Sequence, residues 1–208
     1  MKFWKVLTKI SLQLHNLLYK VISFLAIKTE GGVHPKHRLL NYHQFFLDNI
    51  NSGDKVLDIG CGNGSLSFDL AKKASKVVGI DLNEKYLSLA KQKKLLSNIE
   101  YILGDATLYS FKEKFDAVVL SNVLEHIENR VEFLKKIKPL ANKFLIRVPM
   151  LNRDWIVLYK KELGVDYRLD KTHFTEYTLE GLQEELGVAN YKINNYLVEF
   201  GEICLKAN

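Results

Sequence analysis

A glycine-rich loop behind an acidic residue is the part of this sequence best suited to chemistry. It reads Val-Leu-Asp-Ile-Gly-Cys-Gly-Asn-Gly over residues 56–64, after an apolar, β-branched run and before a helical pattern. Gly60, Gly62 and Gly64 permit tight turns and let a ligand lie against main-chain N–H groups. Asp58 would repel the pyrophosphate of a dinucleotide, so the loop suits a ligand that carries an ammonium group.

Polar residues also stand at the ends of the next three apolar runs. The second run ends in Asp81, which can accept hydrogen bonds from both hydroxyls of a ribose. The third ends in Asp105 and Ala106, suited to the edge of an adenine, and the fourth ends in Ser121 and Asn122. Parallel strands bring their carboxyl ends to one edge of a sheet, so we expect a nucleoside site there. Taken singly, each acid could instead cap the following helix.

The segments that must position these residues alternate between apolar runs and helical patterns. We expect strands at 55–59, 76–80, 99–103, 115–120 and 143–148, and helices at 40–50, 65–74, 83–96 and 124–137. This alternation is typical of a doubly wound α/β sheet. Residues 191–198 and 202–207 flank Gly201 and predict two closing strands. Residues 151–190 form an aromatic insertion with two short helices, where such sheets carry their specificity.

Composition excludes several classes of protein. The chain has 208 residues, 47% hydrophobic and 26% charged, which is a globular composition. Cys61 and Cys204 cannot form a disulfide framework, which favours a cytoplasmic setting. Residues 1–40 hold seven basic side chains and one acidic, which accounts for the whole net charge of +6. Residues 41–208 are therefore neutral overall, and we expect no nucleic-acid partner.

The N-terminal arm, residues 1–40, predicts an amphipathic helix over residues 3–27. Lys9, Lys20 and Lys28 interrupt its apolar stretch, so we expect no membrane-spanning helix, and no cleavage site marks a signal peptide. Two alternatives remain for the apolar face. It packs on the body or on a second copy in a homodimer, or it makes a peripheral contact with the inner face of a membrane.

The motifs from Asp58 to His126 resemble those of class I S-adenosyl-L-methionine (SAM)-dependent methyltransferases. They are the glycine loop, Gly-Ile-Asp at 79–81, Gly-Asp-Ala at 104–106 and Ser-Asn-Val-Leu-Glu-His-Ile at 121–127. The resemblance implies a Rossmann-like, seven-stranded, mostly parallel sheet over residues 41–208 with an antiparallel last strand. It also implies SAM as the cofactor and S-adenosylhomocysteine as the product.

The resemblance implies a role for each residue of the cofactor site. Asp58 and the backbone of the glycine loop would hold the methionine end, Asp81 the ribose, and Asn122 the sulfonium side. The adenine would lie against Leu82 and the 105–106 edge. The full predicted set is Arg38, Asp58, Gly60, Cys61, Gly62, Gly64, Asp81, Leu82, Asp105, Ala106 and Asn122.

Arg38 enters this set through the segment ahead of the loop. Residues 35–42, Pro-Lys-His-Arg-Leu-Leu-Asn-Tyr, are similar to the lead-in of ubiquinone-biosynthesis-type O-methyltransferases. In that family an arginine at this place pairs with the carboxylate of SAM. A solvated basic cluster is the alternative for Arg38.

Histidines supply candidates for a general base. Methyl transfer is an in-line displacement at an activated carbon, so the protein mainly aligns the acceptor and excludes water. A hydroxyl acceptor also needs a base, whereas a neutral amine must only be deprotonated before attack. We expect His173, in the insertion, to be the base, with His126 as second choice. Some relatives bind Mg²⁺ through Glu-x-x-Glu-His plus a later His; here Asn122 replaces the first acid, so we expect no metal.

The sequence therefore predicts a SAM-dependent methyltransferase. We expect transfer to an oxygen of a small or lipid-linked glycan, isoprenoid or phenolic acceptor, in the cytoplasm or at the inner face of the membrane. The alternatives are an N-methyltransferase of a small metabolite, a non-catalytic SAM-binding partner subunit and, further away, an NAD-dependent oxidoreductase.

Overall fold

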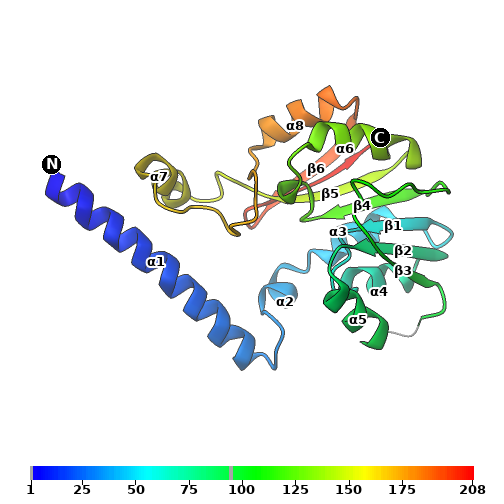
Figure 1. Cartoon of the computed structure of the whole chain (residues 1–208), viewed down its shortest axis with the longest axis horizontal. Coiled ribbons are helices and arrows are strands. Elements are labelled where there is room, and N and C mark those ends of the chain that lie inside the picture. Colours follow the sequence, from blue (N-terminus) through cyan, green and yellow to red (C-terminus); the bar gives the residue numbers. More distant parts are fainter. Residues whose placement is uncertain (1, 94–95) are drawn as a thin grey trace.

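The predicted strands form one mixed sheet of seven strands in the computed structural model, which describes residues 2–93 and 96–208. The sheet order is β3-β2-β1-β4-β5-β7-β6 (Figure 1). Strands β1 to β5 pair in parallel, and β7 is antiparallel to both β5 and β6. The strands are β1 (Lys55–Ile59), β2 (Lys76–Asp81), β3 (Ile99–Leu103), β4 (Ala117–Ser121), β5 (Phe144–Pro149), β6 (Ile193–Glu199) and β7 (Glu202–Ala207). This topology confirms the predicted fold class.

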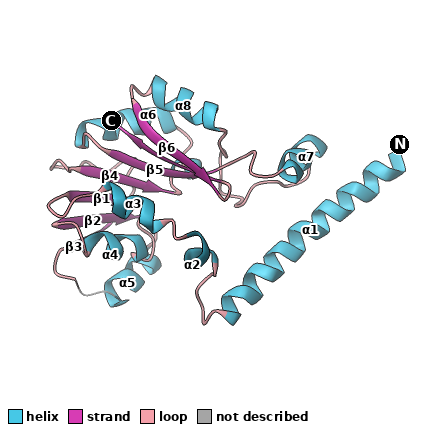
Figure 2. Ribbon diagram, turned by 180° about the vertical axis from the view of Figure 1, so that it is seen from behind, coloured by secondary structure: helices cyan, strands magenta, loops and turns pink. Residues whose placement is uncertain are grey.

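Helices cover both faces of the sheet, as Figure 2 shows from behind. They are α3 (His43–Asn49), α4 (Ser65–Ala71), α5 (Glu84–Lys93), α6 (Arg130–Ile137) and α8 (Leu179–Val188). Helix α2 (Lys36–Leu40) precedes α3 and has no buried residue. Successive strand residues point to opposite faces, so Val119 packs with α3 and α4 while Val118 packs with α6 and α8. Both faces of the central strands are buried, which explains their continuous apolar runs.

Two predicted helices are interrupted. The helix expected at 40–50 is replaced by α2 and α3, because Asn41 takes a left-handed conformation with φ 42°. The helix expected at 124–137 becomes a 3-10 turn, η1 (Leu124–His126), followed by α6. His126 therefore ends a turn and does not begin a helix. Residues 94–95 of the helix expected at 83–96 lie outside the described part of the chain.

Helix α1 (Lys2–Thr29) stands clear of the sheet and its covering helices (Figures 1 and 2). The element that it contacts is α7 (Trp155–Leu163), the first helix of the insertion. Leu12 packs there against Leu163 and Val165. By length and hydropathy alone, α1 is also suited to cross a membrane, which the lysine spacing did not predict.

Candidate active site

The glycine loop between β1 and α4 is shaped by close contacts beneath it. Gly60, Gly62 and Gly64 all have φ between 54° and 71°, where side chains are disfavoured. A Cβ on Gly60 would lie 2.6 Å from Cγ2 of Val123, and one on Gly64 would lie 2.3 Å from the hydroxyl of Tyr101. A Cβ on Gly62 would have nothing within 4 Å, so this glycine faces open space.

Three N–H groups of this loop already donate to the end of β2, which the sequence did not predict. Those of Gly60 and Cys61 donate to the carbonyl of Ile80, at 2.8 and 3.2 Å. The N–H of Gly62 donates to Oδ2 of Asp81 at 2.7 Å. These three bonds tie the loop to the end of β2.

Asp58 lies beneath the loop, with 1% of its surface exposed. Ser67 Oγ on α4 donates a 2.5 Å hydrogen bond to its Oδ2. Burial raises the pKa of Asp58 to about 7, and the hydrogen bond from Ser67 opposes that rise only in part. The structure therefore places Asp58 where it supports the loop, and direct contact with a ligand stays a prediction.

The two acids that follow β2 and β3 each organise a turn. Asp81 accepts from Gly62 and, through Oδ1, from the N–H of Asn83 at 2.8 Å. Asp105 Oδ1 accepts from the backbone and hydroxyl of Thr107, at 2.8 and 2.7 Å. A carboxylate has about four acceptor positions, so both acids keep room for ribose or adenine donors.

These surroundings fit SAM. Leu82 is 69% exposed at the edge of the sheet, which suits an apolar surface for a flat base. The open side of Gly62 and the spare acceptor positions of Asp81 lie next to each other. Cys61 is buried with its side chain against Gly79, so only its backbone faces this edge.

A buried polar group continues the edge at β4 and β5. Asn122, at φ 57°, donates to Oε1 of Glu125 at 2.8 Å and accepts from Arg147 of β5. The guanidinium of Arg147 also lies 3.7 Å from the ring centre of Tyr42. Oε2 of Glu125 and both Nε and Nη1 of Arg147 are buried without a hydrogen-bond partner among the described residues. Unpaired buried groups of this kind are costly, so these atoms are candidates to bond a ligand.

His173 is held by a buried hydrogen bond within the insertion. Its Nδ1 lies 3.2 Å from Oε1 of Glu176, whose side chain is fully buried. Oε2 of Glu176 accepts from Arg153 Nη1 at 2.5 Å, and Oε1 also accepts from the N–H of Leu169 at 2.6 Å. Burial raises the pKa of Glu176, but the hydrogen bonds from His173 and Arg153 outweigh it and hold that pKa below its usual value. This contact orients the ring of His173 through Nδ1, so Nε2 can still accept or donate a proton.

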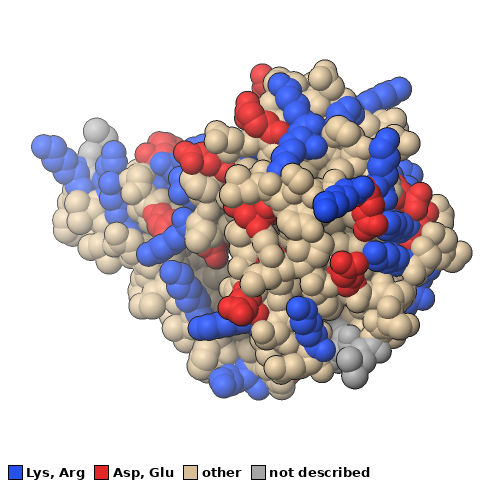
Figure 3. Space-filling view, turned by 45° about the vertical axis from the view of Figure 1, so that its right-hand side comes forward, with Lys and Arg blue, Asp and Glu red and all other residues tan. Residues whose placement is uncertain are grey.

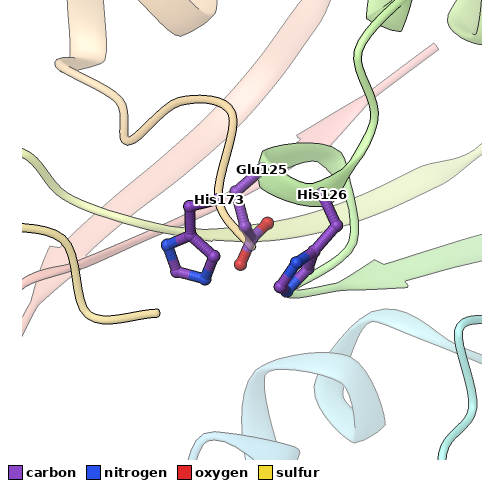
Figure 4. Close-up of side chains that lie close together, drawn as sticks. All are labelled: Glu125, His126 and His173. Atoms are coloured by element: carbon purple, nitrogen blue, oxygen red, sulfur yellow. The ribbon is translucent and has the colours of Figure 1, made fainter. Parts of the chain in front are cut away.

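His126 and Glu125 meet His173 from the other side, as Figure 4 shows. The two imidazole rings are 4.7 Å apart in an edge-to-face arrangement, and Nδ1 of His126 lies 2.9 Å from Oγ1 of Thr172. Burial lowers the pKa of His126 and raises that of Glu125 to about 7. The two histidines predicted as bases thus lie in one cluster.

Backbone hydrogen bonds attach the insertion to the end of β5. Met150 forms a β-bridge with Tyr177, and the N–H of Leu151 donates to the Tyr177 carbonyl at 2.7 Å. The N–H of Phe174 donates to the carbonyl of Glu125 at 2.8 Å. A cavity of about 450 Å³ opens there, lined by His126, Arg168, Lys171, Thr172, His173 and Phe174. An acceptor would enter through this cavity.

The cluster also has the composition of a cation site. One ligand atom each from Glu125, His126 and His173 lies within 4.8 Å of the others. Imidazole and carboxylate ligands suit several divalent ions. The sequence predicted no metal because Asn122 replaces an acid. The closeness of Glu125, His126 and His173 makes a metal site possible without that acid.

Arg38 is not joined to the glycine loop. Its guanidinium pairs with Glu30 at 2.8 Å, and its side chain is 65% exposed. This pair raises the pKa of Arg38 and lowers that of Glu30. Its role toward the SAM carboxylate stays a prediction, and that role would require the pair to open.

Sequence reasoning missed three residues of the site. Glu176 and Arg153 fix His173, and the spacing His-x-x-Glu was the available signal for Glu176. Arg147 was detectable as a charged residue in the middle of an apolar run, Phe-Leu-Ile-Arg-Val at 144–148. Arg147 and Arg153 meet partners 25 and 23 residues away in the chain, so these two pairings had no local signal.

Comparisons with known proteins agree with this geometry. A family model described as a methyltransferase domain matches residues 50–152. The ubiquinone biosynthesis O-methyltransferase of Proteus mirabilis is 29% identical over 153 residues, which cover 68% of this chain and 61% of that protein. N-methyltransferase 4 of Papaver somniferum is 39% identical over 95 residues, which cover 42% of this chain and 27% of that protein. The chain thus spans less than two thirds of the length of either relative.

A solved structure shows the same fold. Magnesium protoporphyrin IX methyltransferase from Synechocystis, with bound S-adenosylhomocysteine, superposes with a TM-score of 0.65. It is 22% identical and covers 83% of this chain and 82% of its own. The sheet order and this superposition define a Rossmann-like fold. With the sequence matches, this fold identifies the chain as a member of the class I SAM-dependent methyltransferases.

Proposed function

We propose that this chain binds SAM and transfers its methyl group to a hydroxyl of a small-molecule acceptor, with His173 as the general base. The bond between His173 and buried Glu176 carries the proposal, because it holds the ring through Nδ1 and leaves Nε2 as the nitrogen that can accept a proton. SAM, when bound, supplies a methyl carbon already activated by the sulfonium.

The residues of the chain would handle the proton. Nε2 of His173 takes it from the acceptor hydroxyl as the oxygen attacks, and the imidazolium that forms is stabilised by Glu176. Arg153 keeps Glu176 ionised, so the carboxylate does not take the proton itself. The buried surroundings of His173, which is 6% exposed, exclude bulk water.

The rim of the cavity favours an anionic acceptor. Arg168 and Lys171 line it beside Phe174. Basic side chains beside an aromatic ring suit a phenol or sugar that carries a carboxylate or phosphate. The O-methyltransferase among the relatives supports a hydroxyl, while the N-methyltransferase keeps an amine as the alternative.

A metal-assisted reaction is the second candidate, favoured by the meeting of Glu125, His126 and His173. A divalent ion there would lower the pKa of a bound hydroxyl, and His173 would then act as a ligand and not as a base. Chelator sensitivity separates the two: the base mechanism survives extensive dialysis against EDTA, whereas the metal mechanism is lost and returns with Mg²⁺ or Mn²⁺.

The test is transfer of label from methyl-labelled SAM. The protein is incubated with extract from its own source, and label is counted in lipid, glycan, small-molecule, protein and RNA fractions. We expect label in a lipid, glycan or small-molecule fraction, and none with His173→Ala. Label confined to protein or RNA would contradict the proposal. Binding of S-adenosylhomocysteine without transfer to any fraction would favour a non-catalytic partner subunit.

A further inference from the structure

We propose that helix α1 lies along the surface of an anionic membrane, with its apolar face in the boundary between headgroups and acyl chains. The proposal rests on the geometry of α1 and α7 and does not depend on the reaction proposed above. The occupant of the apolar face is a lipid bilayer, and a second copy of the chain is the competing outcome.

The side of α1 that faces the protein is its polar side. Asn16 donates a 2.7 Å hydrogen bond to the carbonyl of Asp166 and accepts one of 2.6 Å from Lys160 Nζ on α7. Nδ1 of His15 lies 3.0 Å from the same nitrogen. Leu12 is the buried residue of the helix, and it packs beside these contacts. The protein therefore fixes which way α1 is turned.

The opposite side of α1 is a continuous apolar face that nothing in the described chain covers. It includes Leu7, Ile10, Leu14, Leu17, Val21 and Phe24, each between 39% and 59% exposed. Their spacing of three and four residues places them on one side of a helix, away from Leu12 and Asn16. Figures 1 and 2 show this helix projecting beyond the body. An exposed apolar face of this extent marks an interaction surface.

The positive charge of α1 favours an anionic membrane over a second copy of the chain. Residues 2–29 contain five lysines and no acidic side chain. At the outer end of the arm, on the left of Figure 3, blue basic side chains stand beside uncharged surface. Anionic lipid headgroups complement this charge, whereas a second α1 would add lysines to lysines.

The width of the apolar face also disfavours a two-helix coiled coil. A coiled-coil seam is narrow, and charged residues beside it choose the partner. Here Val6, Leu18 and Leu25 extend the face at those flanking positions. These three are between 50% and 55% exposed, and a second helix would leave part of the face in water.

The contacts to α7 argue for a helix that lies on the membrane and does not cross it. Lys160 and the backbone of Asp166 hold the middle of α1. A crossing helix would draw these groups, with Lys9 and Lys20, into hydrocarbon, where charged side chains are strongly disfavoured. A helix along the surface leaves all of them in water.

Both tryptophans of the chain lie on these two helices, which provides the probe. Trp4 on α1 is 69% exposed and Trp155 at the start of α7 is 72% exposed. Tryptophan collects at membrane interfaces, where its emission shifts to shorter wavelength. The tryptophan emission, excited at a wavelength that tyrosine does not absorb, therefore reports on α1 and α7.

The experiment uses the full chain with two kinds of vesicle, phosphatidylcholine alone and phosphatidylcholine mixed with phosphatidylglycerol. We expect a blue shift and co-sedimentation with the mixed vesicles, weakened by added salt. Lys2→Gln and Lys20→Gln should each weaken this binding roughly fivefold. Equal binding to both vesicles, indifferent to salt, would overturn the proposal.

A matched pair of variants tests the apolar face. Leu17→Glu, at a side chain 58% exposed, should weaken vesicle binding by roughly tenfold or more. Val188→Glu on α8, at a side chain 56% exposed, should bind like the parent. Far-ultraviolet circular dichroism and thermal unfolding check that both variants fold. Equal binding by the two variants would contradict the assignment of α1.

Two further results would overturn the proposal. One is failure to bind either vesicle together with a dimer, seen by sedimentation velocity, that Leu17→Glu dissociates. The other is resistance to alkaline carbonate extraction from cell membranes, which would indicate a spanning helix. Neither result bears on label transfer, so failure of this proposal and failure of the proposed reaction can be told apart.

Discussion

The cofactor side and the acceptor side of the site are built in different ways. The cofactor side uses short local turns, in which Gly60, Cys61 and Gly62 bond to the end of the neighbouring strand β2. The acceptor side joins distant segments, with His126 from η1 meeting His173 from the insertion. Local turns need particular residues at fixed spacing, whereas distant contacts need only complementary partners. The first side can therefore be recognised in a sequence, and the second must be seen in a structure.

The largest effect should come from breaking the buried pair on the acceptor side. Glu176→Gln removes the anion that orients His173 and leaves Arg153 without its charge partner. We expect turnover to fall roughly 10²-fold and the free energy of unfolding to fall by about 2–4 kcal/mol. Steady-state kinetics and urea unfolding measure the two quantities. Glu184→Gln, at an exposed residue of α8, is the control and should change neither; parental turnover in Glu176→Gln would separate the pair from the reaction.

On the cofactor side, Asp81→Ala should weaken binding without the same loss of stability. The carboxylate holds the N–H of Gly62 and would accept from the ribose, so its removal leaves donors unpaired. We expect the affinity for S-adenosylhomocysteine to fall by about 1–3 kcal/mol, measured by calorimetry. Glu84→Ala, an exposed acid three residues further on, should bind like the parent. Unchanged affinity in Asp81→Ala would remove it from the site.

Substitution of two glycines with the same φ separates the cost of backbone strain from the cost of a steric clash. Gly60 and Gly164 both have φ 68°, but only a Cβ on Gly60 meets a neighbour, Val123, at 2.6 Å. Gly164→Ala should cost about 1 kcal/mol of stability, and Gly60→Ala about 2 kcal/mol. Thermal unfolding of both variants tests this. Equal costs would show that Val123 moves aside freely and that the loop is less tightly packed than the structure indicates.

The smallest effect concerns Asp58 and pH. Burial raises the pKa of Asp58 from 3.8 to about 7, so the unfolded chain releases this proton at lower pH than the folded chain. Stability from this group therefore falls as pH rises from 4 to about 7. Asp58→Asn lacks that dependence, so its stability relative to the parent should rise by at least about 1 kcal/mol over this range. Urea unfolding at both ends measures it, and a constant difference would place the pKa of Asp58 near its ordinary value.

The sequence predicted the sheet and the cofactor side of the site more fully than the acceptor side. Apolar runs predicted the parallel strands, and those of the centre of the sheet are buried on both faces and tolerate little else. The glycine loop and Asp81 were predicted as neighbours and are bonded to each other. That the N–H groups of Gly60, Cys61 and Gly62 donate to the end of β2 was not predicted. The break between η1 and α6 was also missed, because the 124–137 pattern keeps a helical period across it.

On the acceptor side, the sequence predicted which histidines take part but not how they are arranged. His173 and His126 were chosen for their chemistry, and the structure brings them together with Glu125. Glu176 was not assigned a role, and its pairing with Arg153 was not predicted, because the two residues are 23 positions apart in the chain. Helix α1 was predicted as amphipathic, but only the structure shows that its polar side faces the protein.

A comparison of turnover with cofactor binding in His173→Ala decides whether His173 is the base. We expect turnover to fall by roughly 10²–10⁴ while the affinity for S-adenosylhomocysteine, measured by calorimetry, stays at the parental value. Such a split would show that the two sides of the site are separate in function as well as in construction. Parental turnover in His173→Ala, with the variant folded and binding the cofactor product, would contradict the account.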